Sequence, residues 1–244
     1  MLVAVFPRTV PRLVFAVTAL LLAGACRGDT PQNPQQSPAP GSSAAAQQPT
    51  SESGEPSRPR IVMLGDSLTA GLGLLESQAF PALIQQKIDT EGYKFEVVNA
   101  GVSGDTSAGG LRRLDWALEG DVKVMVVALG ANDGLRGLSV DEMKNNIGQI
   151  IERASDRGVL CILVGMEAPP NFGPEYTTAF RQAFRDIAVK YRLLFLPFLL
   201  DKVAGQEALN QADGVHPNQQ GAAIVAENLW RVLRPVLDQM PAAQ

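Results

Sequence analysis

From residue 60 onward, short apolar segments alternate with segments of helical periodicity, and this alternation restricts the fold more than any other feature. The apolar segments are rich in β-branched residues or leucine at nearly every position, which is typical of parallel strands buried on both faces. We therefore expect strands at "RIVML" (60–64), "FEVVNA" (95–100), "VKVMVVAL" (122–129), "VLCILVG" (159–165) and "LLFLPF" (193–198).

The intervening segments carry apolar residues at the three- and four-residue spacing of one helix face. A last helix is expected after Pro217. Strands that alternate with helices predict an α/β fold, a three-layer αβα sandwich around a five-stranded parallel sheet. The helical positions are Phe80, Leu83, Ile84 and Ile88; Leu111, Leu114 and Leu118; Ile147, Ile150, Ile151 and Ala154, closed by Gly158; Phe180, Ala183, Phe184, Ile187 and Tyr191; and Val225, Leu229, Val232 and Val236.

Residues 1–26 have the features of a secretory signal. Arg8 and Arg12 precede an apolar run at 14–25 that is too short to span a bilayer as a mature helix. The run ends in "LLAGACRGDT", which resembles a bacterial lipobox with Cys26 as the lipidated residue, although Ala23 stands where Leu or Val is more usual. We expect a cell-envelope lipoprotein anchored to a membrane at Cys26, with a soluble secreted or periplasmic protein as the alternative.

Residues 27–59 are rich in Pro, Gln, Ser and Ala and contain no large apolar side chain. Such a segment cannot bury enough surface to offset the entropy of ordering, so we expect a disordered tether. We expect one domain at residues 60–240, large enough for an enzyme, and no second full domain in a chain of 244 residues.

Composition removes several function classes. The net charge of −4 comes from well-mixed signs, so no basic surface for nucleic acid is expected. Cys26 belongs to the signal and Cys161 lies in an apolar run, which leaves neither a disulfide nor a zinc cluster to expect. The sequence "GLGLLE" (71–76) lacks the third glycine of a dinucleotide fingerprint, so we expect no cofactor.

Polar residues suited to acyl transfer follow the expected strands. Ser67 comes after the first strand in "MLGDSLTAG", and the single histidine of the chain, His216, lies in "DGVHP" after the last strand. A neutral imidazole can take the proton of a serine hydroxyl, and Asp213 at i−3 is placed to orient the imidazole through Nδ1. The backbone N–H groups of Ser67 and Gly104 and the side-chain amide of Asn132 are candidate donors to an oxyanion.

Each of these features alone has an ordinary structural explanation. Gly-Asp-Ser is common in a turn that caps a helix, Gly104 fits a positive φ angle, and Asn132 begins a turn-forming sequence. A histidine before proline is often part of a helix lead-in. Their joint occurrence at successive carboxyl ends of strands, where ligands of open parallel sheets bind, favours a catalytic site.

In these segments the chain resembles the SGNH (GDSL) hydrolase family, in its thioesterase, lysophospholipase and arylesterase branch. The resemblance covers residues 60–237 and rests on "GDSLTAG", "NAGVSGDTSAGG", "GANDGLRG" and "DGVHPN", with "APPNFGPEY" similar to the loop that lines the acyl site in that branch. It implies a flavodoxin-like sheet of order 2-1-3-4-5, Ser67 as nucleophile, His216 as base and Asp213 as its orienting acid. It also implies oxyanion donors at Ser67, Gly104 and Asn132.

The resulting expectation is an exported serine ester hydrolase that acts on a small-molecule or lipid ester through an acyl-enzyme, as a monomer. Leu72, Leu74, Leu75 and Phe172 are placed either to contact an acyl chain or to pack ordinarily. A carbohydrate or acetyl esterase of the same fold is the alternative, and a non-catalytic flavodoxin-like binding module is a remote one. An α/β-hydrolase is disfavoured because no G-x-S-x-G surrounds Ser67 or Ser103.

Overall fold

The sheet of the computed structural model, which describes residues 58–240, has five parallel strands in the order β2-β1-β3-β4-β5. The α/β fold and the flavodoxin-like order 2-1-3-4-5 expected from the sequence are therefore confirmed. The strands are β1 (Arg60–Gly65), β2 (Glu96–Gly101), β3 (Val122–Ala128), β4 (Leu160–Val164) and β5 (Leu194–Leu196).

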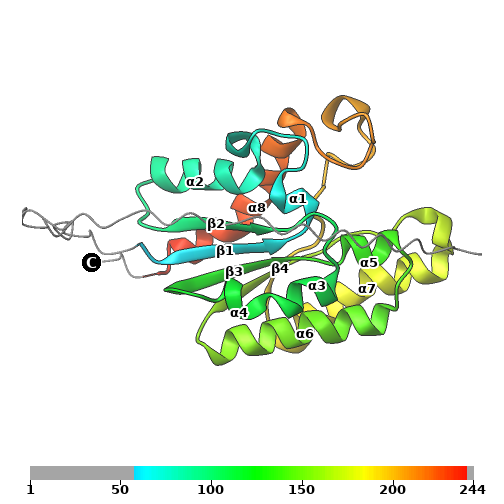
Figure 1. Cartoon of the computed structure of the whole chain (residues 1–244), viewed down its shortest axis with the longest axis horizontal. Helices are drawn as coiled ribbons and strands as arrows, with labels where there is room; N and C mark the ends of the chain where they lie inside the picture. Colours follow the sequence, from blue (N-terminus) through cyan, green and yellow to red (C-terminus); the bar gives the residue numbers. More distant parts are fainter. Residues whose placement is uncertain (1–57, 241–244) are drawn as a thin grey trace, which may run out of the picture. The chain divides into compact units, whose positions relative to one another are not determined.

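Helices cover both faces of the sheet, with α1, α2 and α8 on one face and α3 to α7 on the other (Figure 1). The chain passes from β1 to β2 in one direction and from β2 across to β3 in the other, and right-handed crossovers then place helices on opposite faces. The α-helices are α1 (Ser67–Ala70), α2 (Phe80–Thr90), α3 (Ser107–Arg112), α4 (Leu114–Ala117), α5 (Ala131–Leu135), α6 (Val140–Asp156), α7 (Gly173–Tyr191) and α8 (Gln219–Leu237). Three short 3-10 helices are η1 (Glu76–Gln78), η2 (Pro170–Phe172) and η3 (Glu207–Leu209).

The central strands form the core as expected, but β2 does not. Ile61, Val124 and Ile162 are fully buried in β1, β3 and β4, whereas Val97 and Val98 of β2 are only half-buried. The expectation that β2 and β5 are buried on both faces was wrong because both are edge strands with one neighbour; in β5, Leu194 is exposed and Phe195 is half-buried. The last strand is also shorter than expected, since Pro197 has no N–H to continue the ladder.

The single helix expected around Leu111, Leu114 and Leu118 is instead two short helices, α3 and α4, that meet at Arg113. Leu114 and Leu118 are buried, as the periodicity indicated. The break gives the arginine a non-helical position from which its side chain reaches the sheet edge.

The strand order reverses between β1 and β3, and in sheets of this kind ligands bind beyond the carboxyl ends at that point. Ser67 follows β1 and Asn132 follows β3, so the fold brings both to this point. Cys161 is buried, as expected. Within residues 58–240, no helix has the length and apolar character needed to cross a membrane. The signal segment, Cys26 and residues 27–57 of the tether lie outside the described residues.

Candidate active site

Ser67 is the first residue of α1, directly beyond the end of β1. Asp66 caps the helix: its Oδ1 accepts a hydrogen bond from the N–H of Leu68 at 3.0 Å. The helix lies so close to the neighbouring strand that a Cβ on Gly101 would stand 2.2 Å from the backbone nitrogen of Ala70. Glycine at position 101 thus allows the serine-bearing helix to seat on the sheet.

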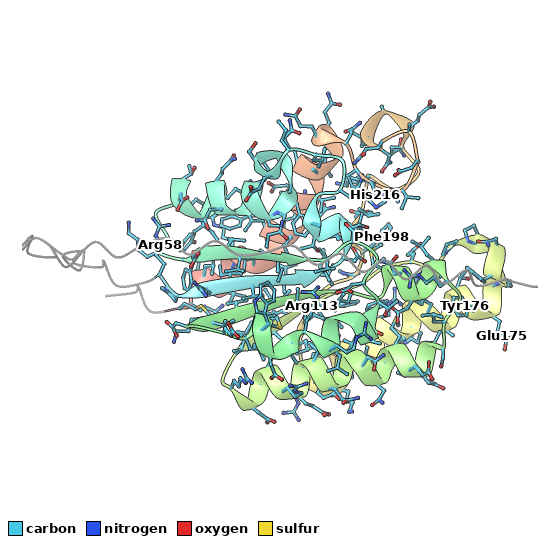
Figure 2. All side chains as sticks on the ribbon, viewed as in Figure 1. Arg58, Arg113, Glu175, Tyr176, Phe198 and His216 are labelled. Carbon is cyan, nitrogen blue, oxygen red and sulfur yellow. The ribbon has the colours of Figure 1, made fainter. Side chains whose placement is uncertain are left out.

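The structure brings His216 to Ser67 and Asp213 to His216. His216 Nε2 is 2.9 Å from Ser67 Oγ, and His216 Nδ1 is 2.7 Å from Asp213 Oδ2. Figure 2 shows His216 beyond the carboxyl ends of the strands, opposite the end of the sheet where Arg58 lies. These atoms form one continuous chain from carboxylate to hydroxyl.

Asp213 holds its negative charge firmly. The backbone N–H groups of His216 and Val215 donate to Oδ1 at 3.0 and 2.9 Å, and these bonds, with that from the imidazole, lower the pKa of Asp213 to about 2. An ionised carboxylate can only accept a hydrogen bond, so the proton between Asp213 and His216 belongs to Nδ1. Nε2 then carries the lone pair that faces Ser67 Oγ.

Gln211 fixes the turn that carries His216. Its backbone N–H donates to the carbonyl of His216 at 2.7 Å, which closes the turn. Its side-chain amide donates to the carbonyls of Leu72 at 2.7 Å and Pro217 at 3.0 Å. Because Leu72 follows the serine-bearing helix, Gln211 joins the histidine turn to the loop after Ser67.

Gly104 and Asn132 lie on neighbouring loops that are bonded to each other. Gly104 has φ +84°, a conformation that favours glycine, and Asn132 Nδ2 donates to the carbonyl of Asp105 at 2.9 Å. In the part of the chain that the structure describes, neither the Ser67 N–H nor the Gly104 N–H donates to another protein group. Both N–H groups are therefore available to a ligand.

Asp66 is buried directly beneath this site, with 1% of its surface exposed. Burial raises its pKa to about 6, against the lowering effect of the Leu68 N–H and of His216. Its Oδ2 is 3.4 Å from Asn132 Nδ2, so the carboxyl group stands between the serine-bearing helix and the asparagine. Sequence reasoning assigned Gly-Asp-Ser to a turn that caps a helix and did not foresee the burial of Asp66, because burial of a capping carboxylate leaves no local sequence pattern.

A second buried carboxylate, Asp133, supports the other loop. Its two oxygens accept the backbone N–H of Ser107 at 2.8 Å and the Ser107 hydroxyl at 2.6 Å, and Asn146 donates to that hydroxyl at 3.0 Å. Asp133 thereby ties the start of α3, which follows the Gly104 loop, to the helix that carries Asn132. The sequence interpretation gave Asp133 no role beyond turn formation.

A small apolar recess with a volume of about 10 Å³ lies beside Ser67 and His216, between α1 and the start of α8. Leu68, Leu72, Leu74, Phe80, Leu200, Pro217, Ala222 and Val225 are among the residues that line it. Of the residues singled out for an acyl chain, Leu72 and Leu74 belong to this recess, while Leu75 is 68% exposed. Phe172 lies elsewhere, packed over Gly137 and against the Tyr176 ring at 5.4 Å between centroids.

Comparison with known proteins agrees with this geometry. The model of the GDSL-like lipase/acylhydrolase family matches residues 63–224. The chain is 40% identical over 178 residues to esterase TesA of Pseudomonas aeruginosa, covering 72% of this chain and 89% of that protein. It is 34% identical over 179 residues to thioesterase 1/protease 1/lysophospholipase L1 of Escherichia coli, covering 73% and 85%. A crystal structure of the psychrotrophic esterase EstA from Pseudoalteromonas sp., inhibited by monoethylphosphonate, is similar with a TM-score of 0.70, 32% identity and coverage of 74% and 99%.

Proposed function

The chain belongs to the GDSL-like lipase/acylhydrolase family and is an ester hydrolase, and we propose that it works through a triad of Ser67, His216 and Asp213. The observation that carries this proposal is the unbroken path from Asp213 Oδ2 through the imidazole to Ser67 Oγ, with atom separations of 2.7 and 2.9 Å. No other histidine exists in the chain to serve as the base.

In the acylation step, His216 Nε2 takes the hydroxyl proton while Ser67 Oγ forms a bond to the carbonyl carbon of the ester. The tetrahedral intermediate then collapses: the bond to the alcohol oxygen breaks, and His216 gives the proton to the departing alcohol. Water repeats the sequence on the acyl-enzyme, with Nε2 as base, and releases the carboxylic acid. Asp213 keeps the proton on Nδ1 and stabilises the imidazolium that forms in each half-reaction.

The negative charge on the carbonyl oxygen needs donors, and the proposed ones are the N–H groups of Ser67 and Gly104 and the amide of Asn132. Both backbone groups are unoccupied within residues 58–240, which supports this assignment. Loss of one donor of this type costs about 2.7–4 kcal/mol of transition-state stabilisation.

The apolar side chains around Ser67 favour an acyl ester with an apolar portion, although the recess itself, at about 10 Å³, has room only for a small group. The relatives are named for esterase, thioesterase and lysophospholipase activities, and we place this chain among acyl-ester hydrolases of that range. The carbohydrate esterase alternative is separated from this assignment by the substrates of the experiment below.

The deciding experiment compares wild-type residues 57–244 with Ser67→Ala and with Ser103→Ala, a matched serine on a neighbouring loop, on p-nitrophenyl esters from acetate to decanoate and on acetylated xylan. We expect Ser67→Ala to lose turnover, Ser103→Ala to retain it, and medium chains to exceed acetate. Equal activity of wild type and Ser67→Ala would overturn the mechanism. A preference for the acetylated polysaccharide would instead overturn the assignment of substrate.

We further propose that the enzyme is exported and anchored by a lipid on Cys26, on the strength of the signal-like segment that ends there. Expression of the full chain and of Cys26→Ala with a labelled fatty acid tests this. Label in the wild type alone supports the anchor, and label in neither chain refutes it.

A further inference from the structure

Arg113, labelled in Figure 2, lies between α3 and α4, and its guanidinium bonds to the carboxyl ends of two strands. Nη2 donates to the carbonyl of Gly65 at 2.7 Å and Nη1 to the carbonyl of Ala100 at 2.8 Å. Nε donates to Asp105 Oδ2 at 2.6 Å, and the two charged side chains are only 18% and 17% exposed. One largely buried arginine therefore joins β1, β2 and the loop after β2.

Two of the three groups that Arg113 holds lie close in the chain to a proposed oxyanion donor. Gly65 is two residues before Ser67. Asp105 directly follows Gly104, and its carbonyl accepts the hydrogen bond from Asn132 Nδ2. A shift of the guanidinium would consequently move the donors at Ser67, Gly104 and Asn132, which lie on segments that follow three different strands.

We propose that Arg113 is a positioning residue for ester hydrolysis, which sets the relative places of the Ser67 N–H, the Gly104 N–H and the Asn132 amide without touching the substrate. This inference rests on the proposed function. Donors to an oxyanion act only when they are fixed in place before the charge develops, and a displacement of about 1 Å can cost roughly 100-fold in rate.

The shape and charge of the guanidinium explain why position 113 requires arginine. Three acceptors lie in different directions around one planar fork, and lysine offers a single charged point that cannot reach all three. Asp105 is confined as well, since a Cβ on Gly109 would stand 2.5 Å from its Oδ1. Removing the guanidinium therefore leaves a carboxylate that is largely buried and unpaired beside the Gly104 loop.

The first test measures kcat and KM of Arg113→Met and Arg113→Lys with p-nitrophenyl butyrate. We expect kcat to fall roughly 100-fold in the methionine variant and about 10-fold in the lysine variant, with KM within about threefold of wild type. Arg60→Met is the control, because Arg60 also links β1 to β2, through Glu96 at 3.0 Å, but at the amino ends of the strands. It should keep the kcat of wild type, and a kcat of Arg113→Met equal to that of Arg60→Met would overturn the inference.

A double-mutant cycle separates positioning from a general structural role. If Arg113 acts through the donors, then Arg113→Met should cost far less in an Asn132→Ala background than in wild type, for example less than about 10-fold instead of about 100-fold. A purely structural role predicts the same factor in both backgrounds, and that result would refute the proposal. Reaction with a fluorophosphonate counts the active sites, so each kcat refers to folded enzyme.

If Arg113→Met does not fold, Asp105→Asn provides the cycle, because it keeps the size and the carbonyl of Asp105 while removing the charged partner of Nε. We expect a kcat loss of about 10-fold that is again reduced by Asn132→Ala, and equal losses in both backgrounds would refute the proposal. Failure of the proposed function looks different, since Ser67→Ala would then remain active. An inactive Ser67→Ala together with unchanged Arg113 variants would refute this inference alone.

Discussion

Replacement of Asp213 by asparagine should damage catalysis more than its replacement by alanine. In Asp213→Asn, the amide oxygen can keep the bonds from the Val215 and His216 N–H groups, which places the NH₂ group 2.7 Å from His216 Nδ1. The NH₂ group can only donate, so the imidazole proton must move to Nε2, and the base that faces Ser67 is lost. The same change in a serine protease triad lowers kcat about 10⁴-fold, and we expect a loss of that order here.

Asp213→Ala removes the orienting group but does not impose the wrong tautomer. Its kcat should therefore fall by a factor toward the lower end of the roughly 10²- to 10⁴-fold contribution of a general base. Values of kcat for p-nitrophenyl butyrate at pH 7 and 8 test the order of the two variants. Asp213 is exposed and makes local bonds, and thermal melting should show nearly wild-type stability for both at neutral pH. A kcat of Asp213→Asn equal to or higher than that of Asp213→Ala would refute the tautomer argument.

Two further predictions concern the support of the site. Gly101→Ala should destabilise the protein by about 1–3 kcal/mol in urea unfolding and lower kcat, because its Cβ would lie 2.2 Å from the Ala70 nitrogen of the serine-bearing helix. Gly92→Ala strains the backbone at φ +82° but meets no atom within 4 Å, so it is the control for a loss of stability away from the site, and equal kcat in both variants would contradict the reasoning. Asp66 has a raised pKa of about 6, so its contribution to stability is complete below the unfolded value of 3.8 and is lost as pH rises through about 6. Relative to wild type, Asp66→Asn should therefore gain roughly 2–3 kcal/mol in unfolding free energy between pH 4 and pH 7, and a constant difference across this range would contradict the raised pKa.

The sequence was sufficient to predict the strands and the edge at which the polar residues meet. Apolar runs such as 122–129 mark buried strands by composition alone, and alternation with helices makes the sheet parallel. A parallel sheet then delivers Ser67 and Asn132 to one edge without any knowledge of side-chain contacts. The burial of β2 was mispredicted because its apolar run has the composition of a central strand; only the family resemblance, through the order 2-1-3-4-5, implied its place at the edge.

The supports of the site were not predictable in the same way. Arg113 sits within an apolar periodicity that indicated one continuous helix, and its partners Gly65 and Asp105 are distant or unremarkable in the sequence. Asp66 and Asp133 occur in turn-like sequences, and nothing local distinguishes a buried capping carboxylate from an exposed one. Long-range bonds to backbone carbonyls depend on the folded geometry, so motif spacing points to the groups proposed to react but not to the residues that hold them in place.

The two halves of the site therefore differ in how they are held. The histidine turn is exposed and depends on short-range bonds within 211–217, with Gln211 as the link to the loop after Ser67. The side of the proposed oxyanion donors depends on largely buried charged groups, Asp66, Asp133 and Arg113, that join segments following separate strands. Loss of a local bond at an exposed turn changes chemistry with little effect on folding, whereas loss of a buried charged partner leaves an unsatisfied group in the core. We therefore expect substitutions of these buried groups to lower both stability and turnover. Substitutions in the histidine turn should lower turnover with little change in stability.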